Sequence, residues 1–326
     1  MFLNELLKRR AGPHPSTTER GVVMSAVVDL HGHAFLDQGP STEGVFPASS
    51  ELFFDVWERP LAFKGKNAYY DVDSHKAIVR TINDKPKVIG VVGKDYNLIK
   101  TEEICKAAES EFLTAMTQEQ LAGVTVRDRT AYFGRVCIRD YQFPAINVEI
   151  DGRGSVAKFR TIVTNGYDGS TSIKIYSGAI DAFCINGMVS GVFELTVKRH
   201  TRGVQVEHLA EHIGKNIKIF YTEAERWKSW VRKEITLEDA EKVFAAMPGA
   251  SERLVAKLLR QFAIECTSRG RNVWALYSAA TYYATYNEGE FATRGTENDH
   301  AAATMLNREL QVRRWTDTQE FLKLAA

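Results

Sequence analysis

Alternation of apolar and polar residues is strongest in the middle of the chain. Between Val124 and Ser177 the two kinds of residue alternate over several short stretches, which Pro144 and the dipeptides Asp-Gly and Asn-Gly separate. Period-two alternation bounded by such turn signals is typical of strands joined by tight connections. The sequence therefore predicts an antiparallel β-meander with the strands VTVRD, AYFGRVCIRDY, INVEI, SVAKFRTIVT and TSIKIYS.

Helical periodicity dominates the chain after Gly203. Apolar residues recur there at the spacing of one helix face, which predicts helices over 208–233, 237–246, 251–268, 273–286 and 299–314. Upstream of the meander, Lys87 to Gly93 predicts a buried strand. Thr101 is then expected to be the N-cap of a helix that runs to Thr117, because two glutamates follow it in the first turn.

Strands followed by helices are typical of an α+β protein rather than of a doubly wound sheet. We therefore expect a central antiparallel β-meander with a preceding helix, followed by a mostly helical C-terminal half. The expected division is 1–85 for an N-terminal arm and small β-rich region, 86–203 for a central α+β domain that holds the antiparallel sheet, and 204–326 for a helical region packed on the sheet.

Composition is that of an ordinary globular protein, with 44% hydrophobic and 25% charged residues among 326. A formal net charge of +1 gives no attraction of the whole molecule to nucleic acid. The segment 151–233 differs, because it holds thirteen Lys and Arg against eight Asp and Glu, a local charge of +5. Such a basic centre can follow a phosphate backbone if its side chains share one face.

The spacing of the cysteines and the length of the apolar runs bear on metal binding, secretion and membrane insertion. Cys105, Cys137, Cys184 and Cys266 form no Cys-x-x-Cys pair, which favours reduced thiols over a zinc or redox motif. The N-terminus lacks the apolar core of a signal peptide, and no apolar run reaches the roughly 20 residues of a membrane-spanning helix. We expect a cytoplasmic protein that contacts no membrane and needs no cofactor.

Polar residues and glycines recur between Thr164 and Thr201, where a plain core would need apolar residues. Asn165-Gly166 and Asp168-Gly169 are turn dipeptides that place Asp168 and Ser170 at the end of a strand. Asn186 follows on the next element, and His200 closes the stretch. We expect Asn165, Asp168, Ser170 and Asn186 to line one polar cleft together with Lys198, Arg199 and His200.

Cations also recur on the predicted strands. Alternation puts Arg135 and Arg139 on one face of their strand, and Lys158 and Arg160 on one face of theirs, with aromatic residues close by in the sequence. Cations that follow phosphates beside rings that stack on bases are typical of single-strand binders. The candidate nucleic-acid-binding residues are Arg135, Arg139, Lys158, Arg160, Lys174, Lys198, Arg199, His200 and Arg202. The alternative is a solvated sheet face with core aromatics behind it.

Other motifs favour structural roles. Trp227 and Trp230 share one helix face within RWKSWVRK, which indicates core packing. The spacings His31-x-His33 and His208-x-x-x-His212 supply only two ligands at a time, so no metal site is expected. Cys184 beside His200 has the residue types of a nucleophile and its base, yet small buried cysteines are commoner. No catalytic motif is satisfied, so the catalytic residues, if there are any, stay unknown.

Several of these motifs occur together in one order. Gly-Lys-x-Tyr at 93–96, Asn-x-x-Asp-Gly-Ser at 165–170, Cys-x-Asn-Gly at 184–187, Arg-His-Thr at 199–201 and the segment NVWALYSAATYYATYN resemble the phage/plasmid-like family called domain of unknown function 932. The resemblance covers Lys87 to Ala325 and implies a phage or mobile-element protein in the cytoplasm of a phage-infected or plasmid-bearing bacterial host. Ser278 departs from it, because an asparagine is expected there.

Three hypotheses for the function remain open. The first is a DNA-processing protein that binds single-stranded DNA, anneals or recombines strands and forms a homo-oligomer, since a helix, a β-meander and further helices are similar in arrangement to phage single-strand annealing proteins. Likeness at the level of the fold is a weak argument for function. The second is an enzyme with its cleft around Asp168, Asn186 and His200, and the third is an interaction protein directed at a host target.

Overall fold

The computed structural model describes residues 41–43, 46–49, 51–181, 186–188, 195–286 and 301–326. By internal contacts the chain divides into the units 1–36 and 37–326. The first unit lies outside the described residues, and all the helices and strands named below belong to the second. The expected boundaries at 85/86 and 203/204 stay a prediction.

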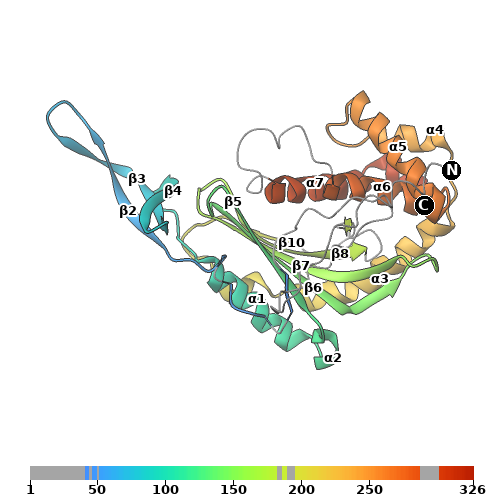
Figure 1. Ribbon diagram of the computed structural model, residues 1–326, viewed down its shortest axis with the longest axis horizontal. Helices are drawn as coiled ribbons and strands as arrows, with labels where there is room; N and C mark the ends of the chain where they lie inside the picture. Colours follow the sequence, from blue (N-terminus) through green and yellow to red (C-terminus); the bar gives the residue numbers. More distant parts are fainter. Residues whose placement is uncertain (1–40, 44–45, 50, 182–185, 189–194, 287–300) are drawn as a thin grey trace, which may run out of the picture. The chain divides into compact units, whose positions relative to one another are not determined.

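An antiparallel sheet occupies the centre of the chain (Figure 1). In the described residues its strands run in the order β1, β5, β6, β7, β8 and β10, and β9 also pairs with β8. Their bounds are β1 Ser41–Glu43, β5 Thr125–Ala131, β6 Val136–Glu149, β7 Val156–Gly166, β8 Ile173–Asp181, β9 Asn186–Met188 and β10 Leu195–Lys198. The predicted antiparallel meander is therefore confirmed.

Two connections within the meander differ from the prediction. AYFGRVCIRDY is not one strand, because Tyr132, Phe133 and Gly134 form a turn with φ of 54°, 63° and 86°. Positive φ is uncommon outside glycine, so a strand pattern does not reveal this turn. INVEI is not separate either, since it continues β6 beyond an irregularity between Phe143 and Asn147. Pro144 lies within that irregularity, where a proline does not interrupt the ladder.

A second sheet has three strands, β2 (Val56–Lys64), β3 (Tyr69–Ile82) and β4 (Lys85–Gly93) in that order. β4 includes the predicted strand 87–93, but Val88 and Val91 are exposed and only the residues between them and Val92 are buried. β4 is thus half-buried rather than buried.

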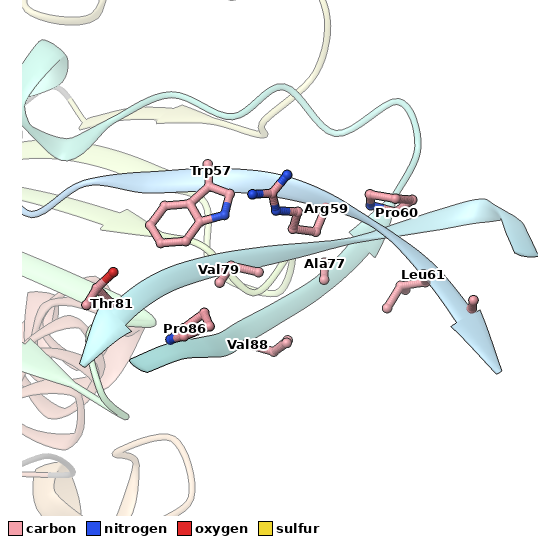
Figure 2. A pocket seen from close by; sticks show the side chains of 10 residues that line it. Trp57, Arg59, Pro60, Leu61, Ala77, Val79, Thr81, Pro86 and Val88 are labelled. Carbon is pink, nitrogen blue, oxygen red and sulfur yellow. The ribbon is translucent and has the colours of Figure 1, made fainter. Parts of the chain in front are cut away.

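One side of this sheet has a hollow of 590 Å³ (Figure 2). The residues that line it include the apolar side chains of Trp57, Pro60, Leu61, Val79 and Val88.

The predicted helices are present, and two short ones join them. The helices are α1 Thr101–Ala115, α2 Gln118–Leu121, α3 Ile213–Arg232, α4 Leu237–Ala245, α5 Glu252–Arg269, α6 Val273–Tyr286, α7 Ala301–Thr316 and α8 Gln319–Ala325, with a short 3-10 helix at Val206–Leu209. The sequence pattern missed α2 and α8, and it placed the start of α3 too early. Lys100, not Thr101, is the N-cap of α1. None of the described helices is long and apolar enough to cross a membrane.

Helices cover both faces of the main sheet. On one face α1 and α3 pack against strand residues, as in the edge-to-face contact of Phe112 with Tyr141 and of Phe220 with Phe159. On the other face lies α7 (Figure 1). Trp227 and Trp230 of α3 are buried, which confirms their predicted core packing. Because both faces are covered, alternation alone does not tell which strand side chains face the larger core.

Candidate functional site

Three of the sequence motifs meet at one end of the main sheet. The Tyr96 ring stacks on the His200 ring with centroids 4.6 Å apart and 17° between the planes. The Tyr96 hydroxyl donates to the carbonyl of Gly166 at 2.7 Å, and the Asn97 amide donates to the carbonyl of His200 at 2.9 Å. The loop after β4, the end of β7 and the loop after β10 are thereby tied together; we call this the motif junction.

His200 is buried within the motif junction. Its Nδ1 lies 3.1 Å from the carbonyl oxygen of Asn97, and because a carbonyl only accepts, Nδ1 must carry the hydrogen. Nε2 is buried and has no hydrogen-bond partner among the described residues. Burial lowers the pKa of His200, although Asp168 acts in the opposite direction. His200 is therefore a neutral, packed side chain at pH 7 rather than a surface cation.

Asn165 lies in a buried polar network behind this stack. Its amide nitrogen donates to the Ile99 carbonyl at 3.1 Å and to the Thr101 hydroxyl at 3.0 Å. The Tyr167 hydroxyl accepts from the Thr101 amide at 2.8 Å and also lies 2.8 Å from the Thr101 hydroxyl. The network fixes the first turn of α1 against the end of β7. Thr101 is not the N-cap of α1, and its hydroxyl bonds to Asn165 and Tyr167 instead.

Asp168 and Ser170 form a local turn. Asp168 Oδ1 accepts from the amides of Ser170 at 3.0 Å and Thr171 at 3.1 Å, and the Ser170 hydroxyl donates to Asp168 Oδ2 at 2.8 Å. A carboxylate that satisfies backbone amides in this way stabilises the turn. Both residues therefore have a structural role here.

Asn186 is not near the motif junction. β10 brings Lys198 opposite Ile173, whereas β9 brings Asn186 opposite Asp181 at the far end of β8. Eight residues of strand separate the two positions, about 26 Å at about 3.3 Å per residue. The prediction of one cleft that holds Asp168, Asn186 and His200 is therefore wrong. Cys184 lies outside the described residues.

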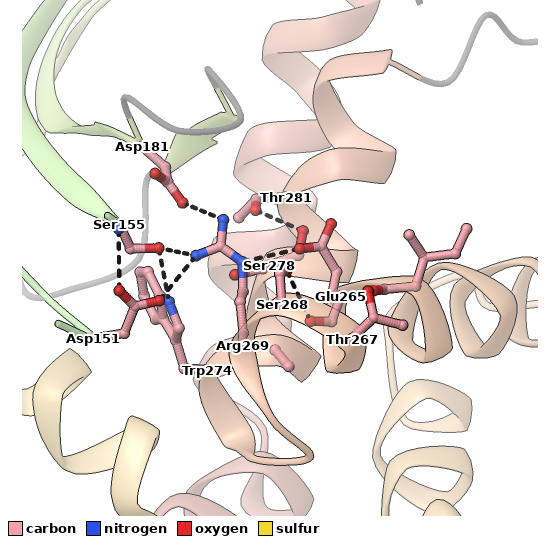
Figure 3. Close-up of polar contacts among 12 residues, drawn as sticks. Asp151, Ser155, Asp181, Glu265, Thr267, Ser268, Arg269, Trp274, Ser278 and Thr281 are labelled. Carbon is pink, nitrogen blue, oxygen red and sulfur yellow. Dashed lines mark hydrogen bonds and ion pairs between the residues drawn. The ribbon is translucent and has the colours of Figure 1, made fainter. Parts of the chain in front are cut away.

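The far end of the sheet holds a buried ionic cluster of its own (Figure 3). Arg269 of α5 lies 2.8 Å from Asp181, 2.9 Å from Glu265 and 3.6 Å from Asp151, and it also donates to the Ser155 hydroxyl. These carboxylates come from the end of β8, from α5 and from the turn before β7. The Arg269 guanidinium thus links α5 to the sheet. Breaking these pairs would leave carboxylates buried without a cation, which is strongly destabilising.

The predicted cationic strand residues point to opposite faces of the main sheet. Arg139 is buried on the α1 face, 3.6 Å from Glu109 and 3.5 Å from Asp128. Arg160 is buried on the α7 face, 2.6 Å from Glu309. The two arginines therefore do not share one face for nucleic acid, and the alternative of a solvated face does not hold for them either, because both are buried under helices.

The remaining predicted cations are spread over several surfaces. Arg135 is exposed next to the turn between β5 and β6, and Lys198 and Arg199 are exposed at the end of β10. Arg202 is exposed and pairs with Asp95 at 3.1 Å. Lys158 and Lys174 are half-buried. The structure therefore does not bring the nine predicted binding residues together on one face.

Strand register gathers a different set of cations on the α7 face. Arg127 pairs with Asp140, Arg160 with Gln142 and Lys174 with Thr164, so these side chains lie on one side of the sheet. We define the basic layer as the cations of that face in β5 to β8, which are Arg127, Arg129, Lys158, Arg160 and Lys174. Sequence reasoning missed Arg127 and Arg129, although alternation along VTVRDRT places them together.

Carboxylates and hydroxyls accompany the basic layer. Asp140 lies 3.9 Å from Arg160 Nε, too far for a hydrogen bond. Among the described residues Arg160 Nε, Asp140 Oδ1, Thr164 Oγ1 and the Tyr176 hydroxyl are buried without a hydrogen-bond partner. Burial also lowers the pKa of Arg129 and of Lys174. Positive charge is therefore concentrated in a partly desolvated place that has unused donors.

The family follows from comparison of the sequence. The family model described as "Domain of unknown function (DUF932)" matches residues 88–310, which is more than half of the chain. The chain belongs to this family. No curated protein and no solved structure matches the sequence of this chain. The matched segment contains the motif junction, the Arg269 cluster and the whole basic layer, together with Glu309. At Ser278, where the resemblance leads us to expect asparagine, a buried serine stands in α6.

In the part of the chain that the structure describes, the histidines form no metal site, and the buried thiols of Cys105 and Cys137 are not reactive. His208 contacts Glu211, and no three His, Cys, Asp or Glu side chains there are arranged to hold a metal ion. His31 and His33 lie outside the described residues. Burial raises the pKa of Cys137 to about 12, and it raises that of Cys105 further still. These two thiols are therefore protonated at neutral pH and poor nucleophiles.

Proposed function

We propose that this chain binds single-stranded DNA and that the phosphates of the strand bind the basic layer. The observation that carries the proposal is the concentration of five cations on one face of four neighbouring strands. The carboxylates of these strands on the same face are Asp140 and the exposed Glu149, and Glu309 of α7 pairs with Arg160. Attraction to phosphate depends on such local charge rather than on the formal net charge of +1.

Partial burial makes this charge more effective. Desolvation lowers the pKa of Lys174, and Arg314 of α7 acts in the same direction. A cation in a place of low effective dielectric interacts more strongly with an anion than a surface cation does.

A layer that is half-buried beside a helix also favours a single strand over a duplex. Duplex DNA is stiff over a persistence length of about 150 base pairs, whereas a single strand bends to follow side chains that lie beside a helix. Phosphates bound in this way leave the bases free to pair. Annealing of complementary strands by a phage or mobile-element protein is therefore the use that we propose for the site.

Binding of a labelled oligothymidylate of about 20 nucleotides, longer than the site of many single-strand binders, tests the proposal by fluorescence anisotropy. We expect the affinity to fall as salt rises, because phosphate neutralisation releases counterions. The double variant Lys158→Ala/Lys174→Ala should bind more weakly, and its salt slope should be smaller by about 0.7 per lost phosphate contact.

The matched control is Lys233→Ala/Lys323→Ala, which removes two exposed lysines outside the basic layer. It should bind as the wild type does. Equal loss of affinity in both double variants would show that only total charge matters, and unchanged affinity in Lys158→Ala/Lys174→Ala would exclude the basic layer as the site.

A further inference from the structure

The strands β2 and β3 continue beyond the third strand of their sheet as a two-stranded ribbon (Figure 1). β4 pairs with β3 only from His75 to Ile82. Nearer the tip, Ala62, Phe63 and Lys64 pair with Asp71, Tyr70 and Tyr69. A turn closed by the Gly65 amide, which donates to the Ala68 carbonyl at 2.8 Å, joins the strands. We call residues 61–71 the arm tip; it precedes the segment that the family model matches.

Aromatic side chains at the arm tip are exposed. Phe63 is 57% exposed, Tyr70 53% and Tyr69 72%. The rings of Phe63 and Tyr70 stack with centroids 5.4 Å apart and 21° between the planes. Tyr70 also lies directly over Gly65, where a Cβ would meet a ring carbon at 2.5 Å. The pair is therefore held in one arrangement while its outer faces stay open to solvent.

Charge at the arm tip is positive on balance. Residues 61–71 hold Lys64 and Lys66 against one carboxylate, Asp71. Lys64 and Lys66 are both exposed. Cations next to open aromatic faces are what a single-stranded nucleic acid requires, since phosphates bind the former and bases stack on the latter.

We propose that the arm tip is a second nucleic-acid contact, where unpaired bases stack on the Phe63–Tyr70 pair and the adjacent phosphates bind Lys64 and Lys66. This rests on the proposed function and adds to it that the protein recognises bases as well as phosphates. A duplex, whose bases are stacked on each other, offers no free base to these rings.

A second copy of this chain is a less suitable occupant. A stable protein interface buries about 800 Å² on each partner, whereas a large aromatic side chain buries only about 150–250 Å² even when fully covered. The pair is already partly covered by its own stacking. Two arm tips placed against each other would also bring the lysines of both copies together, and like charges repel.

Two labelled probes of equal length separate stacking from phosphate binding: an oligothymidylate and an oligomer of abasic sites with the same sugar-phosphate backbone. We expect the wild type to prefer the oligothymidylate by about tenfold, the order of one base–aromatic stack. Phe63→Leu and Tyr70→Leu, separately and together, should lose this preference and bind the abasic oligomer as the wild type does. Lys64→Ala/Lys66→Ala should weaken binding of both probes.

Val91→Thr is the control, because it removes an exposed apolar side chain from the same sheet without changing a ring or a charge. It should keep the preference. The single leucine variants keep an apolar cross-strand contact, so they test the proposal even if the double variant fails to fold.

The outcomes differ for the two proposals. If the wild type binds both probes equally, the basic layer stands and the stacking role of the arm tip is refuted. If it binds neither probe, the proposed function fails and the stacking role fails with it. If the leucine variants keep the base preference but show a smaller mass in solution by light scattering, the arm tip joins copies of the chain instead.

Discussion

The ring of Tyr96 stacks on the ring of His200 with centroids 4.6 Å apart, although the two residues are far apart in the sequence. Tyr96 belongs to the Gly-Lys-x-Tyr motif and His200 to Arg-His-Thr, while the Tyr96 hydroxyl reaches the Gly166 carbonyl next to Asn165. The residues that carry the family resemblance at this end of the sheet therefore contact each other. Their contacts stabilise the fold at this end of the sheet. The surfaces that we propose for binding, the basic layer and the arm tip, lie elsewhere.

Stability should depend on pH through His200. Its folded-state pKa lies below the ordinary value of 6.5, because burial disfavours the charged ring. Above that pH the ring is neutral in both states. Below it the unfolded chain takes up a proton first, so the free energy of unfolding falls as pH falls towards the folded pKa.

Replacing His200 by phenylalanine tests this dependence, because the ring still stacks on Tyr96 but does not titrate. We expect His200→Phe to be less stable at pH 7 by about 1 kcal/mol, the contribution of the lost hydrogen bond to Asn97. The variant should then lose less stability than the wild type between pH 6.5 and about pH 5. Urea denaturation at a series of pH values measures both; parallel curves for the two proteins would contradict the prediction.

Glycine is required at position 90 because the chain passes very close to it. A Cβ there would lie 2.0 Å from the carbonyl oxygen of Tyr167, so the backbones of β4 and the β7–β8 turn would have to separate. We expect Gly90→Ala to destabilise the fold by about 1–3 kcal/mol or more. Gly93→Ala is the matched control, since nothing lies within 4 Å of its added Cβ. Thermal unfolding compares the two, and equal midpoints would refute the close approach.

Arg269 should be among the most sensitive charged residues. Arg269→Met would leave Asp181 and Glu265 buried without their guanidinium, which costs about 3–5 kcal/mol in comparable buried pairs. Arg202→Met breaks the exposed pair with Asp95 and should change stability by about 0–1 kcal/mol. Chemical denaturation of both variants measures the difference. A loss in Arg269→Met no larger than in Arg202→Met would show that the cluster does not stabilise the fold.

The hydroxyl of Tyr167 should stabilise the start of α1. Tyr167→Phe leaves the buried Thr101 amide without its acceptor, and an unsatisfied buried donor costs about 1–3 kcal/mol. Tyr221→Phe, on the exposed side of α3, should have no measurable effect. Hydrogen exchange of the Thr101 amide gives a local readout: we expect it to accelerate in Tyr167→Phe, and unchanged protection would contradict the assigned bond.

Local patterns determined the elements of this fold but not every boundary between them. Alternation over VTVRD and TSIKIYS gave strands, and helical spacing gave α3 to α7, because both patterns follow from which side of an element is buried. Alternation did not reveal the turn at Tyr132 and Phe133, although Gly134 in the same turn is a residue that often interrupts a strand. Two aromatic residues with positive φ carry no turn signal, and their conformation is held by tertiary contacts such as the Arg80 bond to the Phe133 carbonyl at 3.2 Å.

The sequence by itself determined which residues are polar and which strand neighbours share a face; the tertiary structure decided what lies opposite each face. Arg139 and Arg160 have the same chemistry, yet one points to Glu109 of α1 and the other to Glu309 of α7. Asn186 and Lys198 are close in the chain, yet antiparallel pairing places them at opposite ends of β8. Burial periodicity is a local property, whereas the identity of a partner depends on how distant elements pack, so grouping into a site required the folded chain.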